Sequence, residues 1–176
     1  MTQNTCPPIL ENKHYDKASA FVAENRLREA RRQKDLIDSS VPHICVLDPD
    51  GDIVRQTKAT GRATRDPDCA CYHTELYRLT YGGIPLGIVP CAVGASFAVL
   101  VAEQIFAAGC RLLLSVTSSG QLEELRPPPY FVLIERSVRD EGTSYHCLPP
   151  SEYSVADPKL IGIMTSAFTP NAQSRD

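Results

Sequence analysis

The strongest constraint on the fold is a strand–helix–strand pattern over residues 86–120. An apolar run ends at Gly94, a helical stretch over residues 97–108 follows, and a second apolar run comes after Gly109. Ser96 stands where a helix N-cap is expected, and a glycine commonly ends a helix. Two strands joined by a helix at this spacing form a right-handed crossover and lie parallel in one sheet. The pattern therefore predicts an α/β fold.

The rest of the chain adds helices and strands to this unit. An apolar stripe opposite a basic face predicts a helix over residues 22–37, and a final helix is predicted over residues 159–168. Apolar and β-branched runs predict further strands over residues 43–47, 75–81, 84–91 and 130–134. Gly82-Gly83 predicts a hairpin turn, whereas residues 56–72 are expected to be irregular.

Length and composition fit one domain with an ordinary core. The chain has 176 residues, of which 43% are hydrophobic. We expect an N-terminal arm and helix over residues 1–40 and a partial α/β domain over residues 41–176. In that domain a mixed, partly parallel central sheet is flanked by helices. The helix over residues 97–108 is apolar on nearly all sides, so more than the sheet should cover it.

Charge and hydropathy exclude several classes of partner. With 18 Lys and Arg against 21 Asp and Glu, the net charge is -3, which excludes nucleic-acid binding through bulk positive charge. The longest apolar stretch is too short to cross a bilayer. The first residues lack a secretory signal, and seven irregularly spaced cysteines indicate reduced thiols. We therefore expect a cytoplasmic protein that binds neither nucleic acid nor membranes.

Two short motifs have a structural explanation that is simpler than a catalytic one. Cys69-Ala-Cys-Tyr-His73 is narrower than the usual metal-binding knuckle and lacks a fourth ligand, so we expect structural thiols and no metal. Gly94-Ala-Ser-Phe-Ala98 resembles the nucleophile elbow of serine hydrolases. An N-cap role explains Ser96 more simply, so a serine hydrolase is the weaker alternative.

Three polar loops follow predicted strands and are rich in Gly, Ser, Thr or Asp. They are residues 48–55, 91–97 and 117–121. Ligands of α/β sheets bind outside the carboxyl ends of parallel strands. Main-chain N–H groups and hydroxyls in such loops can hold an anion. Together the loops predict a polar pocket suited to an anion.

The same segments, in this order and spacing, resemble the nucleoside phosphorylase family, which includes uridine phosphorylase and the bacterial hexameric purine nucleoside phosphorylases. Four stretches carry the resemblance: Asp48-Pro-Asp-Gly-Asp-Ile-Val-Arg55, Cys91-Ala-Val-Gly-Ala-Ser96, Leu114-Ser-Val-Thr-Ser-Ser-Gly120, and Arg139 through Asp157. They are similar to the family's Gly-Asp-x-x-Arg loop, its Gly-rich turn, its Gly-Ser/Thr-x-Gly loop, and its Asp-Gly-x-Ser stretch with a later Ala-Asp.

The resemblance implies phosphorolysis of the N-glycosidic bond of a nucleoside, which releases the free base and a pentose 1-phosphate. It implies inorganic phosphate as the co-substrate and no cofactor. By resemblance, phosphate is bound by the Gly51 amide, the Arg55 guanidinium and Ser118. The resemblance assigns no catalytic residue in this chain.

The resemblance also implies contacts with the nucleoside and with other subunits. By resemblance, Gly94, Ser119 and Gly120 lie along the nucleoside. Members of the family are oligomers in which neighbouring subunits complete each site. We therefore expect a homo-oligomer whose partners are a nucleoside and phosphate.

Two departures from the family leave alternatives open. Ser115 replaces an arginine that the family uses for phosphate. Other arginines are candidate substitutes, namely Arg62, Arg65 and Arg111. The family's base-reading residues lie beyond the last residue of this sequence, so we expect a fold that is incomplete at its C-terminus. The alternatives are a nucleosidase that uses water and a catalytically inactive phosphorylase-like fragment.

Overall fold

The computed structural model describes residues 10–124 and 126–167. The chain forms two compact units, a sheet unit of Lys17–Gly120 and a C-terminal unit of Met1–Asp16 together with Gln121–Asp176. The first helix belongs to the sheet unit, which ends at residue 120.

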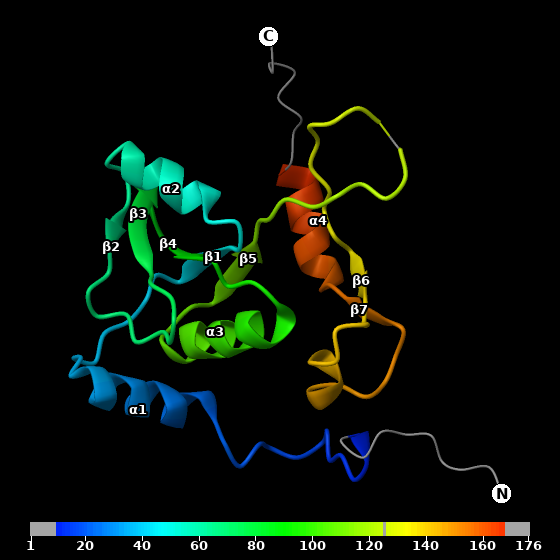
Figure 1. Cartoon of the computed structure of the whole chain (residues 1–176), viewed down its shortest axis with the longest axis horizontal. Helices are drawn as coiled ribbons and strands as arrows, with labels where there is room; N and C mark the ends of the chain where they lie inside the picture. The colour runs from blue at the N-terminus through cyan, green and yellow to red at the C-terminus, as the bar shows by residue number, and fades with distance from the viewer. Residues whose placement is uncertain (1–9, 125, 168–176) are drawn as a thin grey trace, which may run out of the picture. The chain divides into compact units, whose positions relative to one another are not determined.

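The sheet unit is built on a five-stranded mixed sheet with the order β2-β3-β4-β1-β5 (Figure 1). Its strands are β1 (Ile44–Asp48), β2 (Thr64–Arg65), β3 (Tyr77–Tyr81), β4 (Ile84–Pro90) and β5 (Leu112–Ser115). β1 runs parallel to β4 and β5, whereas β3 is antiparallel to β2 and β4. The register pairs Asp48 with Pro90, and Leu47 with Ser115. The three parallel strands therefore end together at what we call the carboxyl edge, and the predicted mixed sheet is confirmed.

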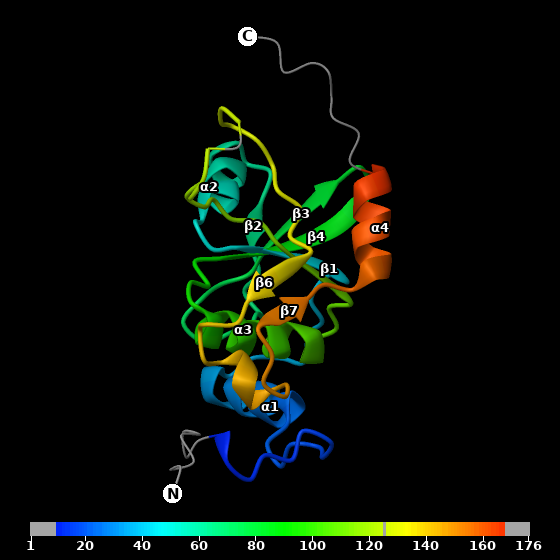
Figure 2. The same ribbon diagram turned by 90° about the vertical axis from the view of Figure 1, so that its right-hand side faces the viewer.

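Helices cover both faces of this sheet. They are α1 (Ala23–Lys34), α2 (Asp52–Ala59) and α3 (Ala95–Ala107). Figures 1 and 2 show α2 on one face and α3 on the other, with α1 lying against α3. Because α3 lies between the sheet and α1, its apolar character on nearly all sides is explained. In the part of the chain that the structure describes, no helix is both long and apolar enough to span a bilayer.

The central strands β1 and β4 pack closely at Gly87. Gly87 is paired with Cys45 in the register. A Cβ atom at Gly87 would lie 2.8 Å from the Sγ of Cys45 and 3.3 Å from the Cδ1 of Leu76. Both neighbours are fully buried, so neither can swing into solvent. The lack of a side chain at position 87 is therefore required by the core.

The starts of α2 and α3 differ from the sequence-based prediction. Residues 56–72 were expected to be irregular, but α2 extends to residue 59. The buried carboxylate of Asp48, at the end of β1, accepts the main-chain N–H of Val54 at 2.9 Å and so stabilises the first turn of α2. α3 begins one residue before Ser96 and its N-cap is Gly94, so the predicted N-cap role of Ser96 is wrong.

The C-terminal unit contains a short hairpin and a helix. Its elements are β6 (Arg136–Val138), the 3₁₀ helix η2 (Ser144–His146), β7 (Tyr153–Val155) and α4 (Pro158–Ala167). β6 and β7 pair antiparallel, and the Asp157 carboxylate accepts the Lys159 N–H at 2.7 Å where α4 begins. The strand predicted at residues 130–134 is wrong, because that segment lies outside the strands that the structure describes. Residue 168, the predicted end of the last helix, lies outside the described residues.

Arg139 stabilises the polar loop between β6 and β7 from inside. The residue is only 5% exposed. Its guanidinium donates to the hydroxyls of Ser144 at 2.8 Å and Ser151 at 2.7 Å. The carbonyl oxygens of Leu148 and Pro149 accept two further bonds, at 3.1 and 2.6 Å. A single buried cation thus holds several turns of this loop together.

Candidate active site

Three loops meet at the carboxyl edge of the sheet, and main-chain hydrogen bonds join them to β1. The carbonyl oxygen of Asp48 accepts the N–H of Gly51 at 2.9 Å and the N–H of Cys91 at 3.0 Å. On the other side of β1, the N–H of Val116 donates to the carbonyl of Leu47 at 2.9 Å. The loops after β1, β4 and β5 are therefore fixed to one strand end.

Asp50 is the residue that joins two of these loops. Its carboxylate accepts the N–H of Ser118 at 2.6 Å and the hydroxyl of Thr117 at 3.2 Å. The guanidinium of Arg55 donates to the main-chain carbonyl of the same Asp50 at 3.4 Å. Arg55 and Ser118, which the sequence analysis assigned to phosphate, therefore both contact Asp50 at the same edge of the sheet.

The hydrogen bonds around Asp50 favour its charged form. The N–H of Ser118 contributes most to a pKa of the Asp50 carboxyl below its ordinary value, and the hydroxyls of Ser118 and Thr117 lower the pKa further. The donors of the turn at residues 117–118 are thus arranged around an anionic oxygen. This is the arrangement that a bound oxyanion requires.

Arg55 is a cation that is accessible to a ligand. Its side chain is 72% exposed on α2, where it forms an ion pair with Asp52 one turn away. The N–H of Gly51 already donates to Asp48, so in this arrangement the amide is not directed outwards. Gly51 has a φ of 74°, and a Cβ there would lie 3.2 Å from the Sγ of Cys91. The glycine thus permits the tight turn that brings Cys91 and Arg55 close to it.

The three residues assigned to the nucleoside lie in loops with open space beside them. Gly94 ends the loop after β4, and its carbonyl accepts the N–H of Ala98 at 2.9 Å in the first turn of α3. Ser119 and Gly120 are exposed in the loop after β5. A Cβ added at Gly94 or at Gly120 would meet no atom within 4 Å. These residues therefore leave room beside the carboxyl edge, on both sides of β1.

The arginines considered as substitutes at position 115 lie elsewhere in the sheet unit. The N–H of Arg111 donates to the carbonyl of His43, at the opposite end of β1. Arg65 forms an ion pair with Glu75 at 2.5 Å. Arg62 lines a cleft whose other residues come from β2, β3, the beginning of β4 and the segment before β1. These contacts hold the three arginines away from the Ser118 loop, whereas Arg55 contacts Asp50, which accepts the N–H of Ser118.

Sequence reasoning identified the loops of this site but not its central residue. Asp50 and Thr117 both fall inside the polar loops that were singled out, yet neither was assigned a role. The available signal was a carboxylate in the turn directly after a buried strand. That signal shows which edge Asp50 occupies, but its contact with Ser118 spans 68 positions in the sequence and depends on the fold.

Cys69 and Cys71 of the Cys69-Ala-Cys-Tyr-His73 motif form a thiol pair. The Cys71 thiol donates to Cys69, and this hydrogen bond lowers the pKa of Cys69 to about 7. The same contact, together with burial, raises the pKa of Cys71. Among residues 10–124 and 126–167, no group of three His, Cys, Asp or Glu side chains is placed to hold a metal ion.

Comparison with solved structures identifies the fold as that of the nucleoside phosphorylases. Uridine phosphorylase from Vibrio fischeri ES114 matches 73% of this chain with a TM-score of 0.60 and 18% sequence identity. Purine nucleoside phosphorylase from Toxoplasma gondii, in complex with immucillin-H, matches 76% with a TM-score of 0.59 and 15% identity. The chain covers 53% and 52% of those two proteins, about half their length. No protein-family profile and no curated protein matches the sequence.

Proposed function

We propose that this chain cleaves the N-glycosidic bond of a nucleoside by phosphorolysis, with inorganic phosphate bound at the carboxyl edge. One observation carries the proposal. The Ser118 amide and the Thr117 hydroxyl converge on one anionic oxygen, that of Asp50, beside the guanidinium of Arg55. The nucleoside phosphorylase fold supports it.

In the proposed complex a phosphate oxygen replaces the Asp50 carboxylate. The Ser118 amide and the Thr117 hydroxyl then donate to phosphate, and Arg55 exchanges its ion pair with Asp52 for the dianion. Asp50 is exposed, so its side chain can turn into solvent when phosphate binds. Phosphate held there has an oxygen available to attack C1′ of the ribose.

The chemistry that these groups can supply is positioning and electrostatic stabilisation. As the bond to the base breaks, positive charge develops at C1′, and the bound phosphate dianion stabilises it. The open space at Gly94 and Gly120 accommodates the nucleoside beside the phosphate. The products are the free base and a pentose 1-phosphate. The exposed apolar side chains of the sheet unit, such as Val93 and Phe106, are consistent with a homo-oligomer.

Hydrolysis by water is the second candidate, and Asp50 is the observation that favours it. The Asp50 carboxylate already occupies the donors of Ser118 and Thr117, and Ser115 stands where a cation would attract phosphate. Both features are unfavourable for phosphate but compatible with a bound water molecule. In this alternative the ionised Asp50 accepts a proton from the attacking water. The reaction then releases the base and free pentose.

The two reactions are separated by measuring base release from pyrimidine and purine nucleosides with and without phosphate. Phosphorolysis predicts base release that requires phosphate and yields pentose 1-phosphate. Equal release without phosphate would instead establish hydrolysis. Loss of phosphate saturation in Arg55→Gln, compared with Arg28→Gln on the exposed face of α1, would place phosphate at the carboxyl edge. No base release from any nucleoside would contradict both candidates.

A further inference from the structure

A polar cleft lies in the sheet unit, away from the carboxyl edge. Its volume is about 540 Å³, which is within the range of small-molecule sites. Four polar side chains contribute to its lining: Arg62, Thr64, Arg78 and Thr80. Pro42, Pro85 and Leu86 supply an apolar wall. The residues that line the cleft thus include two arginines and two threonines beside an apolar surface.

The register of the sheet separates this cleft from the candidate active site. Leu86 pairs with Ile44 at the beginning of β1, and Pro42 precedes that strand. Asp48, at the end of the same strand, pairs with Pro90 at the carboxyl edge. The cleft and the candidate active site therefore lie at opposite ends of β1 and β4.

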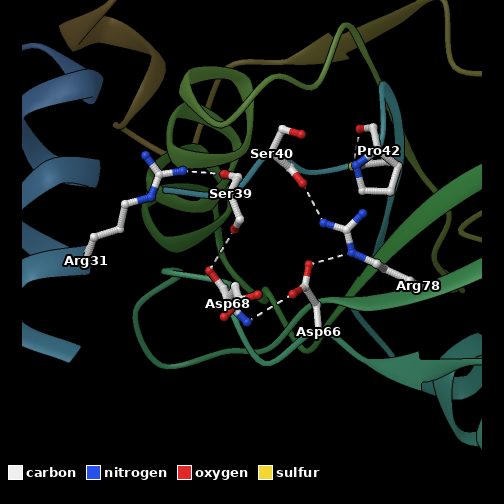
Figure 3. A network of polar contacts seen from close by, with 8 residues as sticks. Arg31, Ser39, Ser40, Pro42, Asp66, Asp68 and Arg78 are labelled. Atoms are coloured by element: carbon white, nitrogen blue, oxygen red, sulfur yellow. Dashed lines mark hydrogen bonds and ion pairs between the residues drawn. The ribbon is translucent and has the colours of Figure 1, made fainter. Parts of the chain in front are cut away.

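The guanidinium of Arg78 is held in place before any ligand binds. Its Nε donates to the Asp66 carboxylate at 2.7 Å, and its Nη2 donates to the carbonyl of Ser40 at 2.5 Å (Figure 3). The Asp66 side chain is only 4% exposed, and its other oxygen accepts the N–H of Asp68 at 3.0 Å. Two contacts thus fix the plane of the guanidinium and leave its Nη1 for another acceptor.

Arg62 supplies a second positive charge that no carboxylate in the described chain neutralises. It follows α2, and among the described residues it takes part in no ion pair. The two guanidinium groups of the cleft therefore outweigh the single carboxylate of Asp66. The positive charge of Arg62, together with the remaining N–H group of Arg78, favours the binding of an oxyanion.

We propose that this cleft binds a small organic anion, whose carboxylate or phosphate group contacts Arg62 and Arg78 and whose apolar part packs on Pro85 and Leu86. Arg78 supplies the preorganised contact and Arg62 the adjustable one. The hydroxyls of Thr64 and Thr80 line the same space and can donate to the remaining oxygens. The site is independent of the proposed nucleoside chemistry, because it shares no residue with the carboxyl edge.

The test is a titration of the ¹⁵N-labelled full chain with benzoate, phenyl phosphate and benzyl alcohol, followed through amide chemical shifts. We expect saturable shifts at Thr64, Arg78 and Thr80 with at least one of the two anions. Binding of benzoate alone identifies a carboxylate site, and binding of phenyl phosphate alone identifies a phosphate-ester site. Shifts confined to Ser118 and Gly120 would overturn the proposal, since those amides report on the carboxyl edge.

Variants separate a specific site from general attraction to a basic surface. Arg62→Ala should weaken binding of the anion about tenfold, because it removes a charge-assisted contact. Arg28→Ala removes an equal charge from the exposed face of α1 and should leave the affinity unchanged. Equal affinity for benzyl alcohol, or no effect of Arg62→Ala, would overturn the role of the guanidinium groups. The titration measures binding at the cleft alone, so its result does not depend on whether the chain cleaves nucleosides.

Discussion

Replacing Gly87 by alanine would place a methyl group against sulfur at the centre of the sheet. The new Cβ would lie 2.8 Å from the Sγ of Cys45, well inside ordinary van der Waals contact. Overpacking of this kind destabilises the folded state by about 1–3 kcal/mol. Alanine also restricts the unfolded chain more than glycine does, which offsets about 0.4–1 kcal/mol of this loss. We therefore expect Gly87→Ala to lower the free energy of unfolding of the sheet unit by about 1–2 kcal/mol.

A double-mutant cycle tests whether the contact with Cys45 is the cause. Cys45→Ala alone should destabilise the sheet unit, because it removes a fully buried sulfur. In that background the methyl group of Gly87→Ala occupies the space left by the sulfur, so the second substitution should cost almost nothing. The two substitutions should therefore be strongly non-additive.

The assay is urea unfolding of the full chain, followed through amide signals of β1 and β4 so that the sheet unit is measured separately. Gly162→Ala is the matched control, because a Cβ at that position in α4 meets no atom within 4 Å. Because α4 belongs to the other unit, that control should leave the free energy of unfolding of the sheet unit unchanged. If Gly87→Ala costs as much in the Cys45→Ala background as it does when Cys45 is present, the packing argument is refuted.

The remaining predictions concern the contact of Asp50 with Ser118, the loop that Arg139 stabilises, and the thiol pair of Cys69 and Cys71. The pKa of Asp50 is lowered by its contact with Ser118, so this contact is fully present above the ordinary carboxyl pKa and is lost as the pH falls through the folded value. A titration of the Ser118 amide shift should show this, and Asp50→Asn should abolish the pH dependence while tightening phosphate binding. Arg139→Met should destabilise the C-terminal unit by about 1.5–3 kcal/mol, because it removes the hydrogen bonds that this buried guanidinium donates to Ser144, Ser151 and two carbonyl oxygens. Unchanged amide exchange around β6 and β7 would argue against this. Iodoacetamide near pH 7 should label Cys69 before Cys71, since their pKa values are lowered to about 7 and raised, respectively; preferential labelling of Cys71, located by peptide mass spectrometry, would contradict the assignment.

Local patterns were sufficient to predict the centre of the sheet unit. The alternation of apolar runs with Gly82-Gly83, Gly94 and Gly109 indicated β3, β4, α3 and β5. The tight turn predicted an antiparallel pair of strands, and the helical crossover predicted parallel strands. α2 was missed because its first turn is stabilised by Asp48, a residue of the preceding strand that is buried only in the folded sheet. The strand expected at residues 130–134 had the right composition, but composition does not provide a pairing partner.

The candidate site shows the same division between local and tertiary information. The position of Arg55 and Ser118 after neighbouring strands could be predicted, because parallel strands end at one edge. The role of Asp50 could not be predicted, since its carboxylate contacts a loop 68 residues away. The donors of a turn can bind a carboxylate of the protein or a ligand. Which of the two they bind depends on side-chain geometry, and the pattern of strands in a sequence does not specify that geometry.

β5 is the last strand of the described sheet, and it is hydrogen-bonded to β1 on one side only. Its other side carries main-chain donors and acceptors that another extended segment could use. An extended segment added on that side would continue the sheet by one strand.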